Sequence, residues 1–244
     1  MAIDQPNPCC CNYRDFSGEL KIVILLFEKM NINELRNLVK SGENETLEFK
    51  RKVAHPEKII KEIVAFANTR GGKLLIGVDD NGSLPGLKFV NEEQFALNQA
   101  IQKFIKPKIN FILKIIPLNA KKSVISYDIL ESKNKPHYVI EDQTQAWGKA
   151  YIRVEDKTIK ASKEIREILK RKNKDKGVHI RFGEKEKILM EYLDQNEFIT
   201  LRKFQQIANL SRPIASRTLV KLVLANVLRI NVNETQDVFT LKLP

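Results

Sequence analysis

Four residues near the carboxyl end of the chain have the chemistry and spacing to bind a nucleic acid. Arg212, Ser216, Arg217 and Lys221 lie opposite the apolar stripe of a predicted helix over 212–225. That stripe, expected to point inward, consists of Ile214, Leu219, Leu222 and Val223. Guanidinium and hydroxyl groups can bond base edges in a major groove, and ammonium groups neutralise phosphates. Arg229 and Lys242, on a following predicted hairpin, could add contacts to the phosphate backbone.

The cysteine and histidine residues do not have the spacing of a metal site. The three cysteines are adjacent at positions 9–11, and His55, His137 and His179 are scattered. Adjacent cysteines cannot supply paired C-x-x-C ligands, so we expect no bound metal and no disulfide framework. This cysteine usage suits a reducing compartment. The apolar run Ile22–Phe27 is too short to span a membrane and lacks the flanks of a signal peptide, so we expect a cytoplasmic protein.

The charge balance favours a polyanionic partner. The chain has 42 Lys and Arg against 30 Asp and Glu, a formal net charge of +12. Basic side chains that neutralise phosphates release condensed counterions, which favours binding. Much of the excess lies in residues 157–187, where a predicted helix with Ile165, Ile168 and Leu169 inward precedes a polar linker. Such a segment is a solvated connector or a clamp on a phosphate backbone.

The order of elements near the carboxyl end predicts a winged helix-turn-helix. Apolar spacing indicates helices over 184–194, 200–208 and 212–225, and a three-residue turn separates the last two. A hairpin of 227–232 and 238–242 follows. Helix, helix, tight turn, helix and hairpin is the order of that domain. Winged helices also serve as protein-binding modules, so the fold alone does not fix the function.

The preceding part of the chain predicts an α+β domain. Helices are expected over 31–40, from Pro56 to a stop at Gly71-Gly72, and over 91–104. Strands are expected over 46–50, 73–78, 110–118, 123–130, 137–140 and 150–154. In the first strand, alternation places Leu47 and Phe49 inward, and Glu48 and Lys50 outward. We therefore predict a loose tail and short helix over 1–30, a mixed α/β domain over 31–170, a basic linker over 171–183 and the winged helix over 184–244.

Three motifs of the first domain resemble a known family. They are E-F-K at 48–50, A-F-A-N-T-R-G-G at 65–72 and I-G-V-D-D at 76–80, with the strand around Tyr151-Ile-Arg-Val later. Together they resemble the Schlafen-type, Alba-like DNA-binding domain, over roughly residues 31–170. The resemblance implies a fusion to a winged helix, as in predicted bacterial transcriptional regulators, and an Alba-like domain used for dimerisation or further nucleic-acid contact. Some relatives are described as ATP-binding, but Gly72-Lys73 is followed by Leu74, so a P-loop is absent.

The same resemblance suggests candidate catalytic carboxylates. RNA-cleaving Schlafen relatives use acidic residues at positions that match Glu43, Glu48 and either Asp79 or Asp80. Three carboxylates could hold Mg²⁺ or Mn²⁺, and Lys50, with Arg51 beside it, could bind a phosphate. In the alternative interpretation Glu48 and Lys50 form a solvated strand face, and the two aspartates only make a turn before Gly82. The nuclease relatives use a duplicated arrangement, so one copy would require a homodimer.

The sequence therefore predicts a DNA-binding transcriptional regulator that acts as a homodimer on double-stranded DNA, with RNA as a second partner. Base contacts would come from the winged helix. The alternatives are a metal-dependent nuclease or ribonuclease, and a nucleotide-sensing regulator for which Gly71-Gly72 gives weak support. Under the favoured interpretation we expect neither a cofactor nor an enzymatic activity, and no membrane partner.

Overall fold

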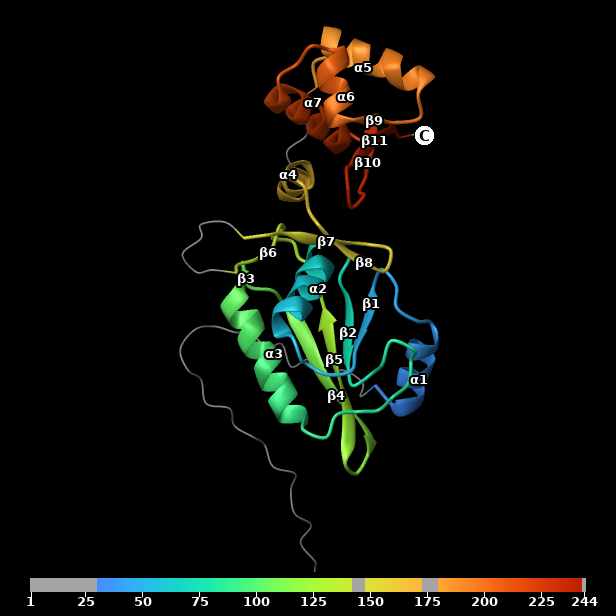
Figure 1. Cartoon of the computed structure of the whole chain (residues 1–244), viewed down its shortest axis with the longest axis vertical. Coiled ribbons are helices and arrows are strands. Elements are labelled where there is room, and N and C mark those ends of the chain that lie inside the picture. Colours follow the sequence, from blue (N-terminus) through green and yellow to red (C-terminus); the bar gives the residue numbers. More distant parts are fainter. Residues whose placement is uncertain (1–29, 142–147, 173–179, 243–244) are drawn as a thin grey trace, which may run out of the picture.

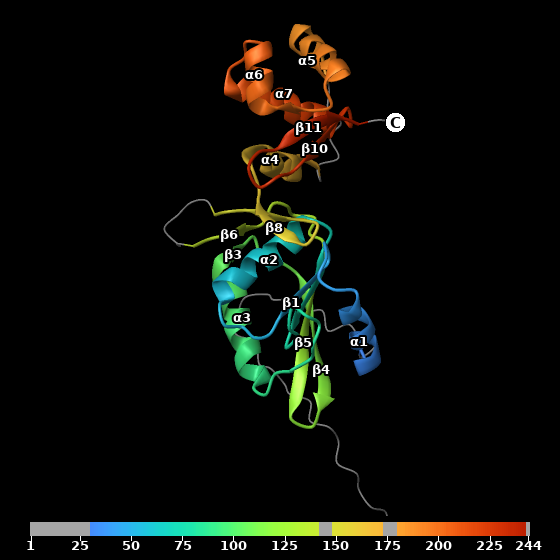
Figure 2. The same cartoon turned by 45° about the vertical axis from the view of Figure 1, so that its right-hand side comes forward.

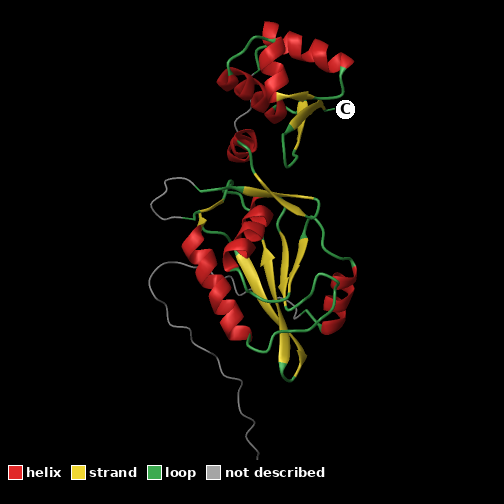
Figure 3. Cartoon of the chain, in the orientation of Figure 1, coloured by secondary structure: helices red, strands yellow, loops and turns green. Residues whose placement is uncertain are grey.

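The computed structural model describes residues 30–141, 148–172 and 180–242. Two groups of elements follow one another along the long axis of the molecule (Figure 1). The first group mixes helices and strands, and in the second group helices lie beside short strands (Figure 3). Residues 1–29 of the tail and short helix predicted over 1–30, and residues 173–179 of the linker predicted over 171–183, lie outside the described residues.

The first group is α+β, as the sequence predicts. Its elements are α1 (Ile32–Lys40), β1 (Leu47–Lys50), α2 (Pro56–Asn68), β2 (Gly72–Ile76), α3 (Val90–Phe104), β3 (Ile105–Lys106), β4 (Phe111–Asn119), β5 (Lys122–Ile129), β6 (Tyr138–Val139), β7 (Tyr151–Val154), β8 (Lys157–Lys160) and α4 (Lys163–Lys172). The strands β3 and β8 were not predicted from the sequence.

A four-stranded sheet of order β1-β2-β5-β4 lies at the centre of this group. The strands β1 and β2 are parallel because α2 connects them, whereas β4 and β5 form an antiparallel hairpin. The helices α2 and α3 bury one face of the sheet, around Phe66, Leu97 and Tyr127. The helix α1 covers part of the other face through Leu35 and Val39 (Figure 2). Covering both faces leaves few solvated positions in the central strands.

Local sequence signals explain where the helices of this group begin. Asn31 caps α1 with a complete capping box, because its side chain accepts from the Glu34 amide and the Glu34 carboxylate accepts from the Asn31 amide. Pro56 occupies the first turn of α2, where a missing N–H costs nothing. The sequence predicts a helix at both places, over 31–40 and from Pro56, but the Asn31 capping box was not part of that prediction.

The second group consists of α5 (Glu184–Gln195), β9 (Ile199–Thr200), α6 (Leu201–Ile207), α7 (Arg212–Leu224), β10 (Leu228–Asn231) and β11 (Val238–Leu241). The predicted three helices and hairpin are confirmed, and the short strand β9 completes a sheet of order β10-β11-β9. This group has its own apolar core around Leu189, Phe204, Leu219 and Phe239. Asn209, with a φ of 48°, allows the tight reversal between α6 and α7.

The helix α4 lies between the two groups. It packs beside α7, and Figure 2 shows it beneath α7 and next to β10. Ile165 of α4 belongs to a small buried cluster with Ala150 and Ile152, and Ile230 and Val232 of the terminal hairpin pack against that cluster. The connection between the groups is therefore a packed interface as well as a covalent link.

In the described part of the chain, no helix combines the length and apolarity needed to cross a membrane.

Candidate nucleic-acid interface

The helix α7 presents a basic outer face. Ala215, Leu219 and Leu222 of this helix are buried in the core of the second group. Arg217 and Lys221 are one helical turn apart on the opposite side, and both are exposed. Arg212 is exposed in the first turn. Within the described residues none of these three side chains forms a hydrogen bond or an ion pair, so all three cations are available to a ligand.

Ser216 does not lie on this outer face, contrary to the prediction. Its side chain is buried with 7% exposure, and its hydroxyl donates to Oε1 of Glu164 in α4 at 2.6 Å. The sequence shows Ser216 as a polar position of α7, but not that α4 packs beside it. Ile214, predicted to point inward, is 43% exposed.

The terminal hairpin adds two exposed basic residues. Arg229 lies opposite Thr240 in the β10–β11 ladder, and its side chain points away from the buried Leu228 and the partly buried Ile230. Lys242 is also exposed, and its Nζ donates to the Asn226 side chain at 3.1 Å, next to the end of α7. Both remain accessible for backbone contacts.

A cleft opens beside the first turn of α7. Arg202 of α6 and Arg212 of α7 line it together with Glu164 of α4 and Asp237 of the hairpin. Burial raises the pKa of Asp237, and the neighbouring Glu164 carboxylate raises it further. The two carboxylates lower the positive potential on this side of α7, so the basic face is strongest around Arg217 and Lys221.

The candidate catalytic carboxylate Glu48 is part of a buried ion pair. It is 6% exposed, which corrects the prediction of a solvated strand face. Nη1 of Arg153, on β7, lies 3.0 Å from Oε2 of Glu48 and 2.9 Å from Oε2 of Glu62 on α2. Lys50 pairs with the other Glu48 oxygen. Glu48 is neutralised by two cations of the chain itself, and is therefore in a structural rather than a metal-binding setting.

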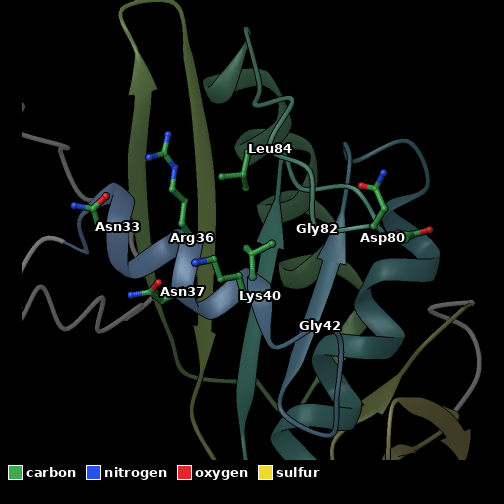
Figure 4. Close-up of a pocket in the computed structure, with 10 residues that line it drawn as sticks. Asn33, Arg36, Asn37, Lys40, Gly42, Asp80, Gly82 and Leu84 are labelled. Atoms are coloured by element: carbon green, nitrogen blue, oxygen red, sulfur yellow. The ribbon is translucent and has the colours of Figure 1, made fainter.

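The other candidate carboxylates are spread over two turns. Oε1 of Glu43 accepts from the Phe49 amide at 2.7 Å, and burial raises the pKa of this carboxyl. Asp79 accepts from the Ser83 hydroxyl at 3.2 Å, as expected for a turn before Gly82. Asp80 is exposed and lines a cleft with Arg36 and Lys40 of α1 (Figure 4). Among the described residues, no three His, Cys, Asp or Glu side chains lie close enough to hold a metal ion.

Lys50 and Arg51 differ in their availability to a phosphate. Lys50 is half-buried, and its Nζ donates to the Phe49 carbonyl at 2.9 Å besides pairing with Glu48. Arg51 is exposed, with its Nε 3.6 Å from Asp79. Of the two, only Arg51 presents an accessible cation.

The glycine pair Gly71-Gly72 is explained by packing. A Cβ on Gly71 would lie 2.7 Å from the Ile129 carbonyl oxygen, and one on Gly72 would lie 2.3 Å from the Phe66 ring. Gly71 also has a φ of 79°, which favours glycine. The pair lets β2 approach α2 and β5 closely, so it gives no support to a nucleotide-binding loop.

Two further residues hold this group together and were not singled out from the sequence. Asn68 is buried and donates to the carbonyls of His137 and Tyr151 at 3.0 and 2.9 Å, and it accepts from the His137 amide at 2.7 Å. Arg153 has a similar structural role. Both lie inside the family motifs, but all their partners except Thr158 are 69 to 109 residues away along the chain, so no local pattern could reveal them.

The sheet, the covering helices and the Asn68 and Arg153 networks define a mixed α+β domain. Residues 43–162 match the family model described as Schlafen, AlbA_2, and this part of the chain is a Schlafen/AlbA_2 domain.

Two solved structures are similar to parts of the chain. The N-terminal domain of a RecG-related protein from Nitrosomonas europaea is 21% identical, with a TM-score of 0.39, and the match covers 52% of this chain and 90% of that one. The DIP2311 protein from Corynebacterium diphtheriae is 15% identical, with a TM-score of 0.42, over 81% of this chain and 34% of that one. No curated protein matches the chain.

Proposed function

We propose that the chain is a DNA-binding transcriptional regulator whose residues 184–244 form a winged helix-turn-helix. The observation that carries this proposal is the outer face of α7, where Arg217 and Lys221 are exposed and unpaired within the described residues. The tight turn at Asn209 joins α6 to α7, and β10 of the following β10–β11 hairpin packs against α7, which supports the assignment of this hairpin as a wing. In this domain class the second helix of the pair enters the major groove.

The chemistry of the outer face suits double-stranded DNA. An arginine can bond O6 and N7 of guanine with two parallel hydrogen bonds, whereas a lysine neutralises a phosphate. Arg217 is the candidate for base contact, and Lys221, Arg212 and Arg229 are candidates for the backbone. The formal net charge of +12 favours the same partner. A single-stranded or structured RNA is the second candidate partner.

The Schlafen/AlbA_2 domain supplies a second surface or the contact of a homodimer in this proposal. Arg51, which directly follows the E-F-K motif at 48–50, is exposed and is the candidate cation of this second surface. A metal-dependent nuclease is not proposed, because Glu48 is paired with Arg153 and Lys50, and no three described His, Cys, Asp or Glu side chains lie close enough to hold a metal ion. We propose that the regulator acts in the cytoplasm, because the three adjacent cysteines suit a reducing compartment.

A double variant tests the proposal. Arg212→Ala with Arg217→Ala should raise the Kd for a mixed-sequence duplex by on the order of tenfold or more at ~0.1 M salt, since it removes one candidate base contact, worth about 1–3 kcal/mol, and one candidate phosphate contact. Fluorescence anisotropy with the full-length protein measures the Kd. Lys88→Ala with Lys121→Ala is the matched control, because it removes the same charge from exposed residues of the first domain. Equal effects of the two variants would contradict the role of α7.

A further inference from the structure

The helix α4 is fixed to the side of α7 by a buried polar contact. The Ser216 hydroxyl donates to the Glu164 carboxylate at 2.6 Å, and both side chains are nearly inaccessible to solvent. A buried charged acceptor without its hydrogen bond is costly, so this contact favours one register of α4 against α7. The hairpin residues Ile230 and Val232 pack on the cluster that contains Ile165 of α4. The helix α4 is thus held on two sides.

The opposite side of α4 is a basic stripe. Lys163, Arg166 and Lys170 follow one another at spacings of three and four residues, which places them on one helix face. Lys163 and Lys170 are exposed and Arg166 is partly exposed. No described carboxylate pairs with any of the three. The neighbouring Arg171, in contrast, is paired with Glu167 at 2.5 Å.

The charge of α4 indicates how it acts beside a DNA-binding helix. Residues 163–172 contain five Lys or Arg and two Glu, of which Glu164 is bonded to Ser216 and Glu167 to Arg171. A segment that masks a DNA-binding face would be expected to be acidic, because it would have to compete with phosphates for the same cations. The exposed side of α4 carries the charge of a DNA-binding element instead.

We propose that the stripe Lys163, Arg166 and Lys170 binds backbone phosphates of the same duplex that α7 contacts. The inference rests on the proposed function and adds a second binding helix to it. From Lys163 to Lys170 the stripe extends about 10 Å, or roughly three base-pair steps of 3.4 Å. The Glu164–Ser216 contact makes these two residues positioning residues, since they hold the stripe at a fixed place relative to Arg217 and Lys221.

The stripe is tested by the triple variant Lys163→Ala, Arg166→Ala, Lys170→Ala in the full-length protein. With a mixed-sequence duplex of ~30 base pairs, about three helical turns, we expect the salt slope of log Kd to fall by roughly 2 to 3 and the Kd to rise on the order of tenfold or more at ~0.1 M salt. The matched control is Lys88→Ala, Lys108→Ala, Lys121→Ala, which removes three exposed charges elsewhere. Circular dichroism confirms that each variant is folded.

The outcomes separate this inference from the proposed function. If the triple variant behaves like its control while Arg212→Ala with Arg217→Ala loses affinity, the proposed phosphate binding by the α4 stripe is wrong. The proposal of a DNA-binding regulator then still stands. Loss in neither set, or no binding by the unaltered protein, overturns both. The positioning role is tested by Ser216→Ala, which removes the hydroxyl that bonds to Glu164 and leaves every charge in place. This variant should weaken binding with little change in salt slope. Tighter binding by Ser216→Ala would show that α4 masks α7, and would also overturn the inference.

Discussion

The Arg153 guanidinium lies 3.0 Å from the Glu48 carboxylate, although the two residues are 105 positions apart in the chain. The same guanidinium contacts Glu62 at 2.9 Å and donates to the Asn44 carbonyl at 2.8 Å, and its side chain is 1% exposed. It also lies 4.9 Å from the centre of the Phe66 ring. The Arg153 cation therefore joins β1, α2 and β7. Its ion pair occupies Glu48, which the family resemblance suggests as a catalytic carboxylate.

Removing this cation should strongly destabilise the first domain. Arg153→Met leaves the carboxylates of Glu48 and Glu62 buried with less compensation, and breaking a buried pair in this way costs roughly 3–5 kcal/mol. Urea unfolding followed by circular dichroism at pH 7 measures the loss. Adding Glu48→Gln to Arg153→Met should recover part of the stability, because one stranded charge is gone. A loss below about 1 kcal/mol would show that the network contributes little.

Periodicity along the chain was sufficient to predict most helices and strands. The helices α1, α5 and α7 follow directly from apolar residues three and four apart, and the start of α2 follows from Pro56. These signals are local, so a single sequence contains them.

The environment of individual side chains depends on distant partners and was predicted less well. Because Glu48 alternates with the apolar Leu47 and Phe49, the sequence predicts a solvated side chain at this position. In the structure both faces of the sheet are covered, and Glu48 is buried in an ion pair with Arg153. Ser216 has the spacing of an outer residue of α7, yet α4 packs beside it. The strand β8, Lys157–Lys160, which pairs with β7 in a hairpin, was not predicted because its lysines made it look like part of the charged segment that follows.

Asn68 should be as important for stability as an apolar core residue. Asn68→Ala leaves the amide and carbonyl of His137 and the carbonyl of Tyr151 without their side-chain partner, and each unsatisfied buried group costs about 1–3 kcal/mol. We expect a total loss of roughly 2–4 kcal/mol by chemical denaturation. Asn68→Asp should also destabilise, because a carboxylate cannot donate to the two carbonyls. Gln99→Ala, which removes a side-chain amide from an exposed position of α3, is the control and should change stability little.

His137 should make stability depend on pH below neutrality. Its ring is buried, with Nδ1 2.8 Å from the Pro107 carbonyl and Nε2 unpartnered within the described residues. Burial lowers the pKa of His137, and the nearby Lys135 lowers it further. As pH falls below the ordinary value of 6.5, the unfolded chain gains a proton that the folded state does not bind, so stability decreases.

The variant His137→Asn tests this effect, because the Asn amide can donate near the position of Nδ1 and does not titrate. Between about pH 6.5 and about pH 5, we expect the unfolding free energy to change less steeply with pH in the variant. The difference in slope should correspond to the uptake of up to about one proton on unfolding. Urea midpoints at several pH values provide the measurement. A variant with the same slope as the unaltered protein would assign the pH dependence to other groups.

Arg217 and Lys221 should contribute differently to sequence preference, although both are exposed on the same face of α7. If Arg217 bonds a guanine edge, Arg217→Ala relaxes the preference at one base pair and costs about 1–3 kcal/mol on the preferred sequence. If Lys221 contacts a phosphate, Lys221→Ala weakens binding to all sequences alike and lowers the salt slope by about 1. Selection of bound duplexes from a randomised library, with each variant and the unaltered protein, measures the preference position by position. Identical preferences for Arg217→Ala and the unaltered protein would show that α7 supplies charge but does not distinguish bases.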